Sequence, residues 1–341
     1  MVLPRAKAPT IIDIATEAGV SKSVVSRALL NQGDVSEATR QRVREAADRL
    51  GYVANAMASG LRSRTNTLGV VLRDLTRPFY GELLAGMQEA AERSGYRIVT
   101  MTSADDLDTA HAIRALRHLV SMQVDGLVVA SARLPSDEIV PLIDRVPIVV
   151  AGRRDVSPGI TSVSSDDVDG GTSLAQLALE HGHRRLAVLL VGAAYSQSQH
   201  ARGVAMIDMI RRAGAEAEVW DVSSDADAGE ALGRELRRSA ATALLCPTDA
   251  VAVEALDVLR LLGRSAPDDL SILGYDGIGP LASSFLGLTT FRVPVRAIGA
   301  TAIELLAAKV ADPTTADQNV TLRGEVVSGR TLGTAVERPS G

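Results

Sequence analysis

The side chains with the most readable chemistry lie between Thr10 and Gly60. Lys22 and Ser23 open a predicted helix over SKSVVSRAL and place an ammonium group and a hydroxyl group at its N-terminal end. Groups of this kind, at the start of a short helix, can donate hydrogen bonds to base edges in the major groove of DNA. The arrangement therefore favours DNA binding over catalysis.

Three predicted helices must position these side chains. The first begins near Ile11, Gly19 allows a sharp turn after it, and Ser21 is a natural N-cap for the second. A third helix is expected over residues 37–50. Apolar residues at helical spacing give each helix an inner face, at Ile11, Ile14, Ala15, Val25, Ala28, Leu29, Val43, Ala46, Ala47 and Leu50. This pattern is typical of a helix-turn-helix unit.

The same stretch resembles the lactose/galactose repressor family of bacterial transcription regulators. The family pattern runs roughly T-x-x-D-x-A-x-x-A-G-V-S, then V-S-R, then V-S-x-x-T-R and L-x-Y. The chain meets it at Thr10, Asp13, Ala15, Ala18, Gly19, Val20, Ser21, Val25, Ser26, Arg27, Val35, Ser36, Thr39, Arg40, Val43, Leu50, Tyr52, Asn55, Ala58 and Leu61. A bare helix-turn-helix pattern would be a weak signal, whereas this many fixed spacings are specific.

The resemblance implies a set of DNA-contacting residues. Lys22 and Ser23 match base-reading positions, Val24 could touch a thymine methyl group, and Arg27 could contact a base or a phosphate. The remaining expected contacts, mostly to the DNA backbone, are Thr10, Ser21, Ser26, Asn55 and Ala58. The alternative left open is that Thr10 and Ser21 only cap helices and that Lys22 is only solvated.

Residues 55–66 are expected to form a hinge helix and linker between the DNA-binding head and the rest of the chain. A helix of about nine residues is not stable alone, so it should order against a partner. Leu61 matches the family's leucine that wedges into a minor-groove step beside its copy from a second subunit. The alternative is a core role for Leu61, but its neighbours are polar. Ala54 replaces the family's usual proline.

Composition is consistent with a basic head on an acidic body. The chain has 341 residues and a net charge of −5, and residues 1–64 hold ten Lys or Arg against six Asp or Glu. That length predicts two or three domains. The single cysteine, Cys246, excludes an internal disulfide, and its apolar surroundings predict a buried thiol. The sequence shows neither an 18-residue apolar run nor a secretion-signal pattern, which predicts a cytoplasmic protein without a membrane span.

From Leu68 onward, apolar strand-like runs alternate with segments of helical period, which predicts parallel sheets buried on both faces. The expected strands are 68–72, 97–101, 126–130, 147–152, 185–191, 243–247, 270–276 and 288–293. The resemblance implies a body like a periplasmic sugar-binding protein, with two subdomains and crossovers near residues 164, 291 and 323. The expected fold class is α/β, with a helix-turn-helix head (1–54), a hinge (55–66) and a body (67–341). The subdomains would cover about 67–164 with 292–322, and 165–291 with 323–341.

The resemblance also implies an effector cleft between the two subdomains. Asp276 lies in a G-Y-D match at a strand's carboxyl end, where open α/β sheets bind ligands, and Arg202 lies in an R-x-x-G match. An arginine and a carboxylate can clamp vicinal hydroxyls. Asp249 is a third match, with a helix N-cap as its alternative. The further candidates are Phe79, Tyr80, Asp105, Ser198, Ser224 and Thr248.

Three positions depart from the family's pattern around this cleft. Ser224 lies where an aromatic lid is often found. Thr248 lies where the family commonly has a polar amide or a glycine, and Val293 where it usually has glutamine. Trp220 could substitute for the missing aromatic platform, but the run AEVW indicates a strand residue. The expected pocket therefore lacks an obvious aromatic platform for a sugar ring.

Motifs for enzymes and metal sites are missing from the sequence. It contains no G-x-S-x-G, no phosphate loop and no H-E-x-x-H. His181 and His183 are better explained by a helix C-terminus than by a metal. No catalytic residue, metal or cofactor is expected.

The expected function is a ligand-responsive, sequence-specific transcription regulator. It would repress a sugar-utilisation operon, bind a pseudo-palindromic operator as a homodimer and be released by a sugar-like inducer. The C-terminal segment has no leucine heptad, which favours a dimer over a tetramer. The alternatives are a nucleoside or other non-sugar effector, a corepressor, or a small-molecule binding protein without a regulatory role.

Overall fold

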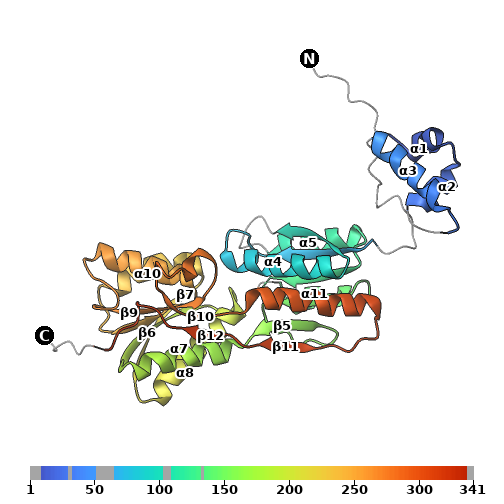
Figure 1. Cartoon of the computed structure of the whole chain (residues 1–341). Coiled ribbons are helices and arrows are strands. Elements are labelled where there is room, and N and C mark those ends of the chain that lie inside the picture. The colour runs from blue at the N-terminus through green and yellow to red at the C-terminus, as the bar shows by residue number, and fades with distance from the viewer. Residues whose placement is uncertain (1–8, 30–32, 51–64, 103–108, 132–133, 336–341) are drawn as a thin grey trace. The chain divides into compact units, whose positions relative to one another are not determined.

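The structure is a computed structural model that describes residues 9–29, 33–50, 65–102, 109–131 and 134–335. The chain divides into two compact units, Met1–Thr65 and Asn66–Gly341, which we call the head and the body (Figure 1). Each unit is described by itself.

The described part of the head contains three helices, α1 (Ile11–Ala18), α2 (Lys22–Leu29) and α3 (Glu37–Leu50). Thr10 caps α1 in a reciprocal capping box with Asp13, and Gly19 ends the helix with a φ of +67°. The Ser21 hydroxyl accepts a hydrogen bond from Val24 N at 3.3 Å, as an N-cap of α2 does. The three helices predicted for residues 10–50 and their caps are confirmed, whereas residues 55–64 of the predicted hinge helix lie outside the described residues.

A small apolar core holds the three helices together. Ile14, Val25 and Val43 are fully buried, one from each helix, and Ala28 and Ala46 fill the space between them. The prediction that Leu50 faces inward is wrong, because this last residue of α3 is 36 % exposed. The core is thus built by the middle of each helix and leaves the N-terminal end of α2 at the surface.

The body contains two six-stranded sheets, and we call the parts built around them the N-subdomain and the C-subdomain. The first sheet has the order β11-β5-β4-β3-β1-β2 and the second β12-β10-β9-β8-β6-β7. All strand pairs are parallel except β10 with β12. The bounds are β1 Thr67–Leu72, β2 Arg97–Thr102, β3 Gly126–Ala130, β4 Ile148–Ala151, β5 Thr161–Ser165, β6 Arg185–Val191, β7 Glu216–Val222, β8 Ala243–Leu245, β9 Ser271–Asp276, β10 Thr289–Arg292, β11 Asn319–Leu322 and β12 Glu325–Val327.

The chain passes between the two sheets three times. It leaves the first sheet after β5, returns to the N-subdomain between β10 and α11, and leaves again between β11 and β12. The eight expected strands are confirmed. The strands β5, β7, β11 and β12 were not among them, although Trp220 lies in β7 as its sequence context indicated.

Helices cover both faces of each sheet, as parallel sheets require. Alternate residues of β6 show this, since Leu186 and Val188 pack in the cluster with α7 and α8, whereas Ala187 and Leu189 pack with α9 and α10 (Figure 1). The helices are α4 Pro78–Arg93, α5 Thr109–Ser121, α6 Ser136–Ile139, α7 Asp167–Glu180, α8 Gln197–Arg212, α9 Ala228–Glu235, α10 Asp249–Leu261 and α11 Val295–Ala311. Within the described residues, no helix combines the length and apolar character that a bilayer crossing requires.

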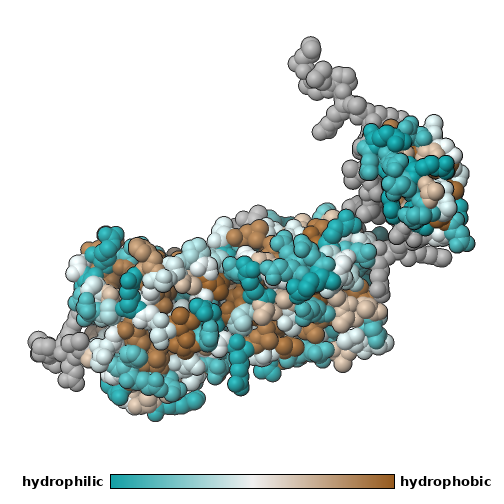
Figure 2. Space-filling view, viewed as in Figure 1, coloured by the Kyte–Doolittle hydropathy of each residue, from teal (hydrophilic) through white to brown (hydrophobic). Residues whose placement is uncertain are grey.

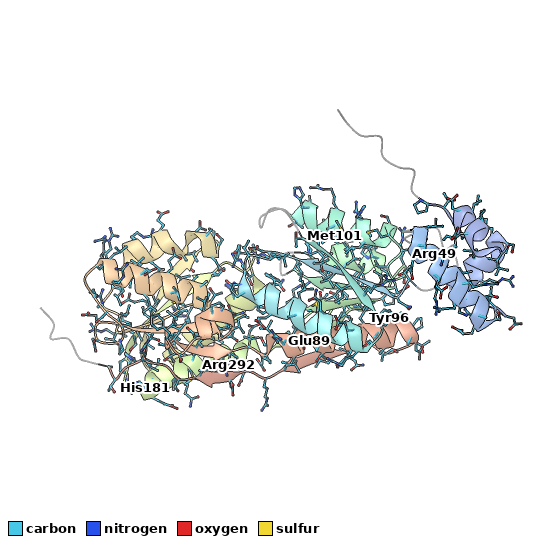
Figure 3. All side chains as sticks on the ribbon, turned by 45° about the horizontal axis from the view of Figure 1, so that its top comes forward. Arg49, Glu89, Tyr96, Met101, His181 and Arg292 are labelled. Atoms are coloured by element: carbon cyan, nitrogen blue, oxygen red, sulfur yellow. The ribbon has the colours of Figure 1, made fainter. Side chains whose placement is uncertain are left out.

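Helices α4 and α11 of the N-subdomain pack closely where the chain enters this subdomain from β10. A Cβ atom on Gly86 of α4 would lie 2.1 Å from the backbone oxygen of Arg296, so α4 and α11 touch backbone to backbone. Arg296 also pairs with two glutamates of α4, with Glu82 and, at 3.1 Å, with Glu89, which is labelled in Figure 3. The start of α11 is therefore held firmly against α4.

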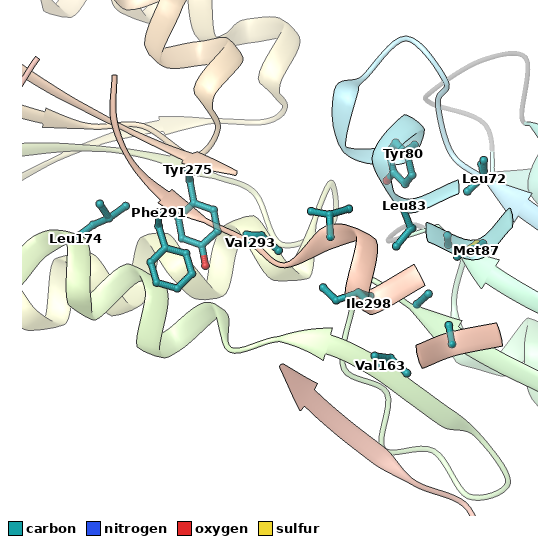
Figure 4. Close-up of a cluster of buried hydrophobic side chains, with 14 of the residues drawn as sticks. Leu72, Tyr80, Leu83, Met87, Val163, Leu174, Tyr275, Phe291, Val293 and Ile298 are labelled. Carbon is teal, nitrogen blue, oxygen red and sulfur yellow. The ribbon is translucent and has the colours of Figure 1, made fainter. Parts of the chain in front are cut away.

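The buried core runs continuously from one subdomain to the other. Tyr275 and Phe291 stack with ring centroids 5.0 Å apart, and Val293 and Ile298 lie between this pair and the leucines of the N-subdomain (Figure 4). Val293 lies on the crossover segment itself, so the connection between the sheets is packed rather than solvated.

The two histidines singled out by sequence have structural partners. His181 Nδ1 lies 2.9 Å from the Leu177 carbonyl at the end of α7. His183 is buried, with Nδ1 2.8 Å from Thr242 Oγ1 and Nε2 3.1 Å from the Gly333 carbonyl, and its burial lowers its pKa. Burial also raises the pKa of the Cys246 thiol far above its usual range, which makes it unreactive.

Candidate functional site

A cleft opens between the two subdomains at the carboxyl ends of the strands of both sheets. Its wall from the N-subdomain includes Phe79 and Tyr80 of α4 and Gly152, which follows β4. Its wall from the C-subdomain includes Ser198 and Arg202 of α8 and residues at the end of β9 and the start of α10. The carboxyl edge of parallel strands is the usual ligand-binding edge of such sheets.

Arg202 is the electrostatic centre of the cleft. It is 6 % exposed, and its guanidinium nitrogens lie 3.2 Å from Asp167 Oδ1 and 3.5 Å from Asp276 Oδ1. It also donates to the Pro247 carbonyl at 3.1 Å, and its guanidinium carbon lies 3.7 Å from the centroid of the Tyr275 ring. One cation therefore serves two carboxylates and an aromatic face.

Asp276 is held in an unusual backbone conformation at the end of β9. Its φ is +120°, a region that side chains other than glycine rarely adopt, and Gly277 follows it with a φ of +62°. Such strain persists only where the surroundings enforce it, and it is common in binding sites. Burial raises the pKa of Asp276 and of Asp167, and Arg202 offsets this only in part.

Asp249 is a structural carboxylate at the floor of the cleft. Its Oδ2 accepts from Gly277 N at 2.7 Å and its Oδ1 accepts from Thr290 Oγ1 at 2.6 Å. The N-cap of α10 is Thr248, whose hydroxyl accepts from Val251 N, so the alternative of Asp249 as N-cap is wrong. Asp249 lines the cleft, but both of its carboxylate oxygens accept hydrogen bonds from the protein, and one of these bonds holds the backbone directly after Asp276 in place.

The structure brings most of the predicted cleft residues together. Those lining the cleft are Phe79, Tyr80, Ser198, Arg202, Thr248, Asp249 and Asp276. Ser224 is the exception, because its hydroxyl donates to Asp227 Oδ2 at 2.9 Å and caps the short turn over residues 225–227. Trp220 is buried in the core beside β6 rather than in the cleft. Asp105 lies outside the described residues.

A contact between the subdomains was not predicted. Arg73 donates a hydrogen bond to the backbone carbonyl of Tyr195 at 3.1 Å, and its guanidinium carbon lies 4.1 Å from the centroid of the Tyr195 side-chain ring. Arg77, the N-cap residue of α4, pairs with Asp225 and hydrogen-bonds the Tyr195 hydroxyl. Arg73 and Arg77 belong to the N-subdomain and Tyr195 and Asp225 to the C-subdomain, so we call these four residues the cross-cleft clasp.

Asp167, Gln199 and Ser196 also line the cleft and were missed. Ser196 caps α8, with its hydroxyl accepting from Gln199 N at 3.4 Å, which is a readable sequence signal. Asp167 is the first residue of α7, in an Asp166–Asp167 pair that could have been read as a helix start. Nothing local in the sequence indicates that it faces Arg202.

Gly171 of α7 allows helix α8 to carry Arg202 into the cleft. A Cβ atom at this position would lie 2.3 Å from the Arg202 backbone oxygen. We expect Gly171→Ala to lower the free energy of unfolding by about 1–3 kcal/mol through overpacking. Gly233→Ala in α9 is the control, because no atom lies within 4 Å of its added Cβ, and it should stabilise by about 0.5–1 kcal/mol. Urea unfolding measures both, and an equal gain in both variants would contradict this packing.

In the head, Lys22, Ser23 and Arg27 have exposed side chains on α2, whereas Val24 and Ser26 are half-buried. The Arg27 Nε group donates to the Ser23 carbonyl at 3.3 Å. The hydroxyls of Thr10 and Ser21 do cap helices, as the alternative reading held. Asn55, Ala58 and Leu61 lie outside the described residues.

Known proteins resemble the chain over both units. Residues 10–55 match the family described as bacterial regulatory proteins, lacI family, and residues 65–325 match periplasmic binding proteins and sugar binding domain of LacI family. The transcriptional regulator DegA of Bacillus subtilis is 30 % identical over 300 residues, which cover 85 % of this chain and 88 % of DegA. The repressor PurR of Aliivibrio fischeri is 29 % identical, with 89 % of this chain and 92 % of PurR covered.

Solved structures give the same result. A LacI-family transcriptional regulator from Silicibacter pomeroyi superposes with a TM-score of 0.83 at 26 % identity, covering 95 % of this chain and 99 % of that one. The regulator CelR in complex with cellobiose superposes with a TM-score of 0.69 at 26 % identity over the same shares. The resemblance seen in the head is thus confirmed in both the head and the body, and the chain belongs to the LacI family of bacterial regulatory proteins.

Proposed function

We propose that this chain is a transcriptional repressor whose head binds a pseudo-palindromic operator and whose cleft binds a sugar-like effector. The observation that carries the proposal is the buried Arg202 between Asp167 and Asp276, in a cleft of the same chain that presents a helix-turn-helix. Two carboxylates that one buried cation holds in place can accept hydrogen bonds from several hydroxyl groups in fixed directions. The complex of CelR with cellobiose supports a sugar as the effector class.

The DNA-binding mode that we propose places the N-terminal end of α2 in the major groove. Lys22 and Ser23 would contact base edges, Val24 a thymine methyl group, and Arg27 a base or a phosphate. Thr10, Ser21, Ser26 and Asn55 would contact phosphates, with Ala58 beside them and Leu61 as the minor-groove wedge. The target is chromosomal DNA, so the proposed site of action is the cytoplasm.

We propose a homodimer as the operator-binding form, since two heads match the two halves of a pseudo-palindrome. The body exposes several large apolar side chains, of which Phe285 is 83 % exposed and Leu261 77 %. Apolar areas also interrupt the polar surface of the body in view (Figure 2). Exposed aromatic side chains are frequent in protein–protein contacts.

The proposed mechanism couples the cleft to the head through subdomain closure. The effector would bind one degree of closure better than another and so shift the population of the body between them. The three crossovers are the only covalent links between the sheets of the described body, so closure moves the first strand of the body, β1, relative to the C-subdomain. Release by an inducer is the proposed sign of the effect.

Selection of bound genomic fragments, followed by footprinting and titration, tests the DNA-binding part. We expect Lys22→Ala to weaken the selected site by about 1–3 kcal/mol and to relax sequence preference at one base pair per half-site. The matched control is Arg42→Ala, which removes an exposed charge from α3 in the same unit. Base reading by Lys22 would be wrong if the two variants lost the same small affinity with unchanged sequence preference.

A further inference from the structure

Asp167 combines burial with incomplete hydrogen bonding at the wall of the cleft. Its side chain is 13 % exposed, and Oδ1 lies 3.2 Å from Arg202 Nη2. That oxygen is shielded from solvent. Arg202 and Ser198 lie close enough to lower the pKa of the Asp167 carboxyl, but among the described residues neither gives this oxygen a well-aligned hydrogen bond. Buried acceptors in proteins are almost always satisfied, so a group that is not satisfied by the protein indicates a donor from elsewhere.

Positive charge is fully matched by negative charge around the cleft. Among the described residues, three guanidinium groups and three carboxylates line the cleft, and two further carboxylates pair with one of these guanidinium groups from outside the lining; the lining residues are Arg73, Arg77, Arg202, Asp167, Asp249 and Asp276, and the two outside it are Asp74 and Asp225. Asp74 and Asp225 are paired with Arg77. Both oxygens of Asp249 are used by Gly277 and Thr290. The carboxylates left to meet a ligand are therefore Asp167 and Asp276, which share Arg202.

The arginines are committed to partners within the protein. Arg73 and Arg77 serve the cross-cleft clasp, and Arg202 serves the two carboxylates, the Pro247 carbonyl and the Tyr275 ring. An anionic ligand would have to take a guanidinium from a buried carboxylate and leave that carboxylate without its cation. Breaking a buried ion pair in this way is strongly unfavourable.

Hydrogen-bond donors from a ligand would have the opposite effect. Burial raises the pKa of both Asp167 and Asp276, which means that the protein alone stabilises their charged forms poorly. Hydroxyl or ammonium groups of a ligand that donate hydrogen bonds to these oxygens would stabilise the charged carboxylates, as water does for a solvent-exposed carboxylate. The cleft is thus complementary to donors and opposed to anions.

We propose that Asp167 is an effector-reading residue and that, with Asp276, it restricts the effector to molecules rich in hydrogen-bond donors and free of anionic groups. Sugars, polyols, amino sugars and nucleosides meet this condition, whereas sugar phosphates, sugar acids and nucleotides do not. The inference rests on the proposed function of the cleft as the effector site.

The test compares the binding of each uncharged or cationic compound with the binding of an anionic derivative of the same compound. The full chain is screened by thermal shift, then by calorimetry, against D-glucose and D-glucose 6-phosphate, D-ribose and D-ribose 5-phosphate, cellobiose and cellobionate, D-glucosamine and glucosamine 6-phosphate, and adenosine and adenosine 5′-monophosphate. A compound at 100 times its Kd adds about 2.7 kcal/mol, a shift of several degrees. We expect binding by at least one uncharged or cationic member and weaker or no binding by its anionic partner.

The variant Asp167→Asn turns this preference into a prediction about one residue. It removes one negative charge beside Arg202. The affinity for the neutral compound divided by the affinity for its anionic derivative should therefore fall at least tenfold. Asp169→Asn is the matched control, because Asp169 lies one half-turn along the same helix with an exposed side chain, and its ratio should not change. The comparison of paired compounds on the wild-type chain needs no variant, so it decides the question even if Asp167→Asn folds poorly.

Three results would overturn the inference. One is tighter binding of an anionic member than of its neutral partner by the wild-type chain. Another is an unchanged ratio in well-folded Asp167→Asn. The third is a screen without any neutral or cationic hit on protein that still binds its operator, which leaves the regulator function standing and removes this effector class. Loss of operator binding itself would instead count against the proposed function.

Discussion

Replacing Arg202 with alanine is expected to abolish effector binding and to lower the free energy of unfolding by about 3–5 kcal/mol. The reason is that Asp167 and Asp276, at 3.2 and 3.5 Å from its guanidinium, would lose their shared cation while remaining buried. The Pro247 carbonyl and the Tyr275 ring would lose their partner as well. This is the largest single-residue effect that we expect in the body.

The loss should depend on pH in a defined direction. Burial already raises the pKa of Asp167 and Asp276 above the ordinary value, and removal of Arg202 raises both further. A carboxyl group whose pKa is higher in the folded state costs stability when the pH rises through that pKa. The charged groups facing the pair are Arg202 on α8, Asp249 on α10, Asp225 beyond β7 and Asp166, the N-cap residue of α7. Among the described residues, therefore, no second cation takes the place of Arg202. The free energy of unfolding that Arg202→Ala loses relative to wild type should therefore be smaller at pH 5 than at pH 8.

Urea unfolding at both pH values measures this prediction. The triple variant Arg202→Met, Asp167→Asn and Asp276→Asn is the matched control, because it removes the cation together with the two charges that need it. It should recover most of the lost stability without recovering effector binding. A deficit that is equal at both pH values, or that persists in the triple variant, would show that Arg202 acts through packing instead of charge.

Sequence predicted those parts of the fold that local signals determine. The head follows from Thr10, Gly19 and Ser21 at helix ends and from apolar spacing between them, and the eight apolar strand runs all became strands. Strand β5 was missed because its sequence, TSVSS, is polar. It is nevertheless buried, with Ser162 Oγ 2.6 Å from Asn319 Oδ1 of the neighbouring strand. A partner 157 residues away leaves no trace in the local pattern.

The same distinction separates the predicted and the missed residues of the cleft. Arg202 and Asp276 stand in recognisable motifs, and the structure places them within 3.5 Å of each other. Asp167 stands in no such motif. Ser224 was expected near the cleft, yet it is the next residue, Asp225, that reaches toward it and meets Arg77. Motifs predicted which segments meet, but not which side chain of a segment faces inward.

The cross-cleft clasp should control how far the subdomains close. We expect Arg77→Ala and Asp225→Ala each to favour an open cleft, since each removes the same ion pair between the subdomains. Coupling between paired charges makes the effects non-additive, so the double variant should open little further, with an interaction energy of about 0.5–3 kcal/mol. Energy transfer between fluorophores on Arg117→Cys in α5 and Arg260→Cys in α10 would report the opening. Native Cys246 is fully buried and will not compete for label.

The control for the clasp is Arg93→Ala, which removes an arginine from the same helix as Arg77 but breaks only an exposed pair with Glu304 inside the N-subdomain. Exposed pairs contribute about 0–1 kcal/mol, so transfer should stay at the wild-type value. Labelled chains are diluted into excess unlabelled protein, so that transfer between two copies does not contribute. Additive changes in the double variant would show that Arg77 and Asp225 act separately. Unchanged transfer in all three clasp variants would show that the packed crossover at Val293, rather than the clasp, sets the closure of the cleft.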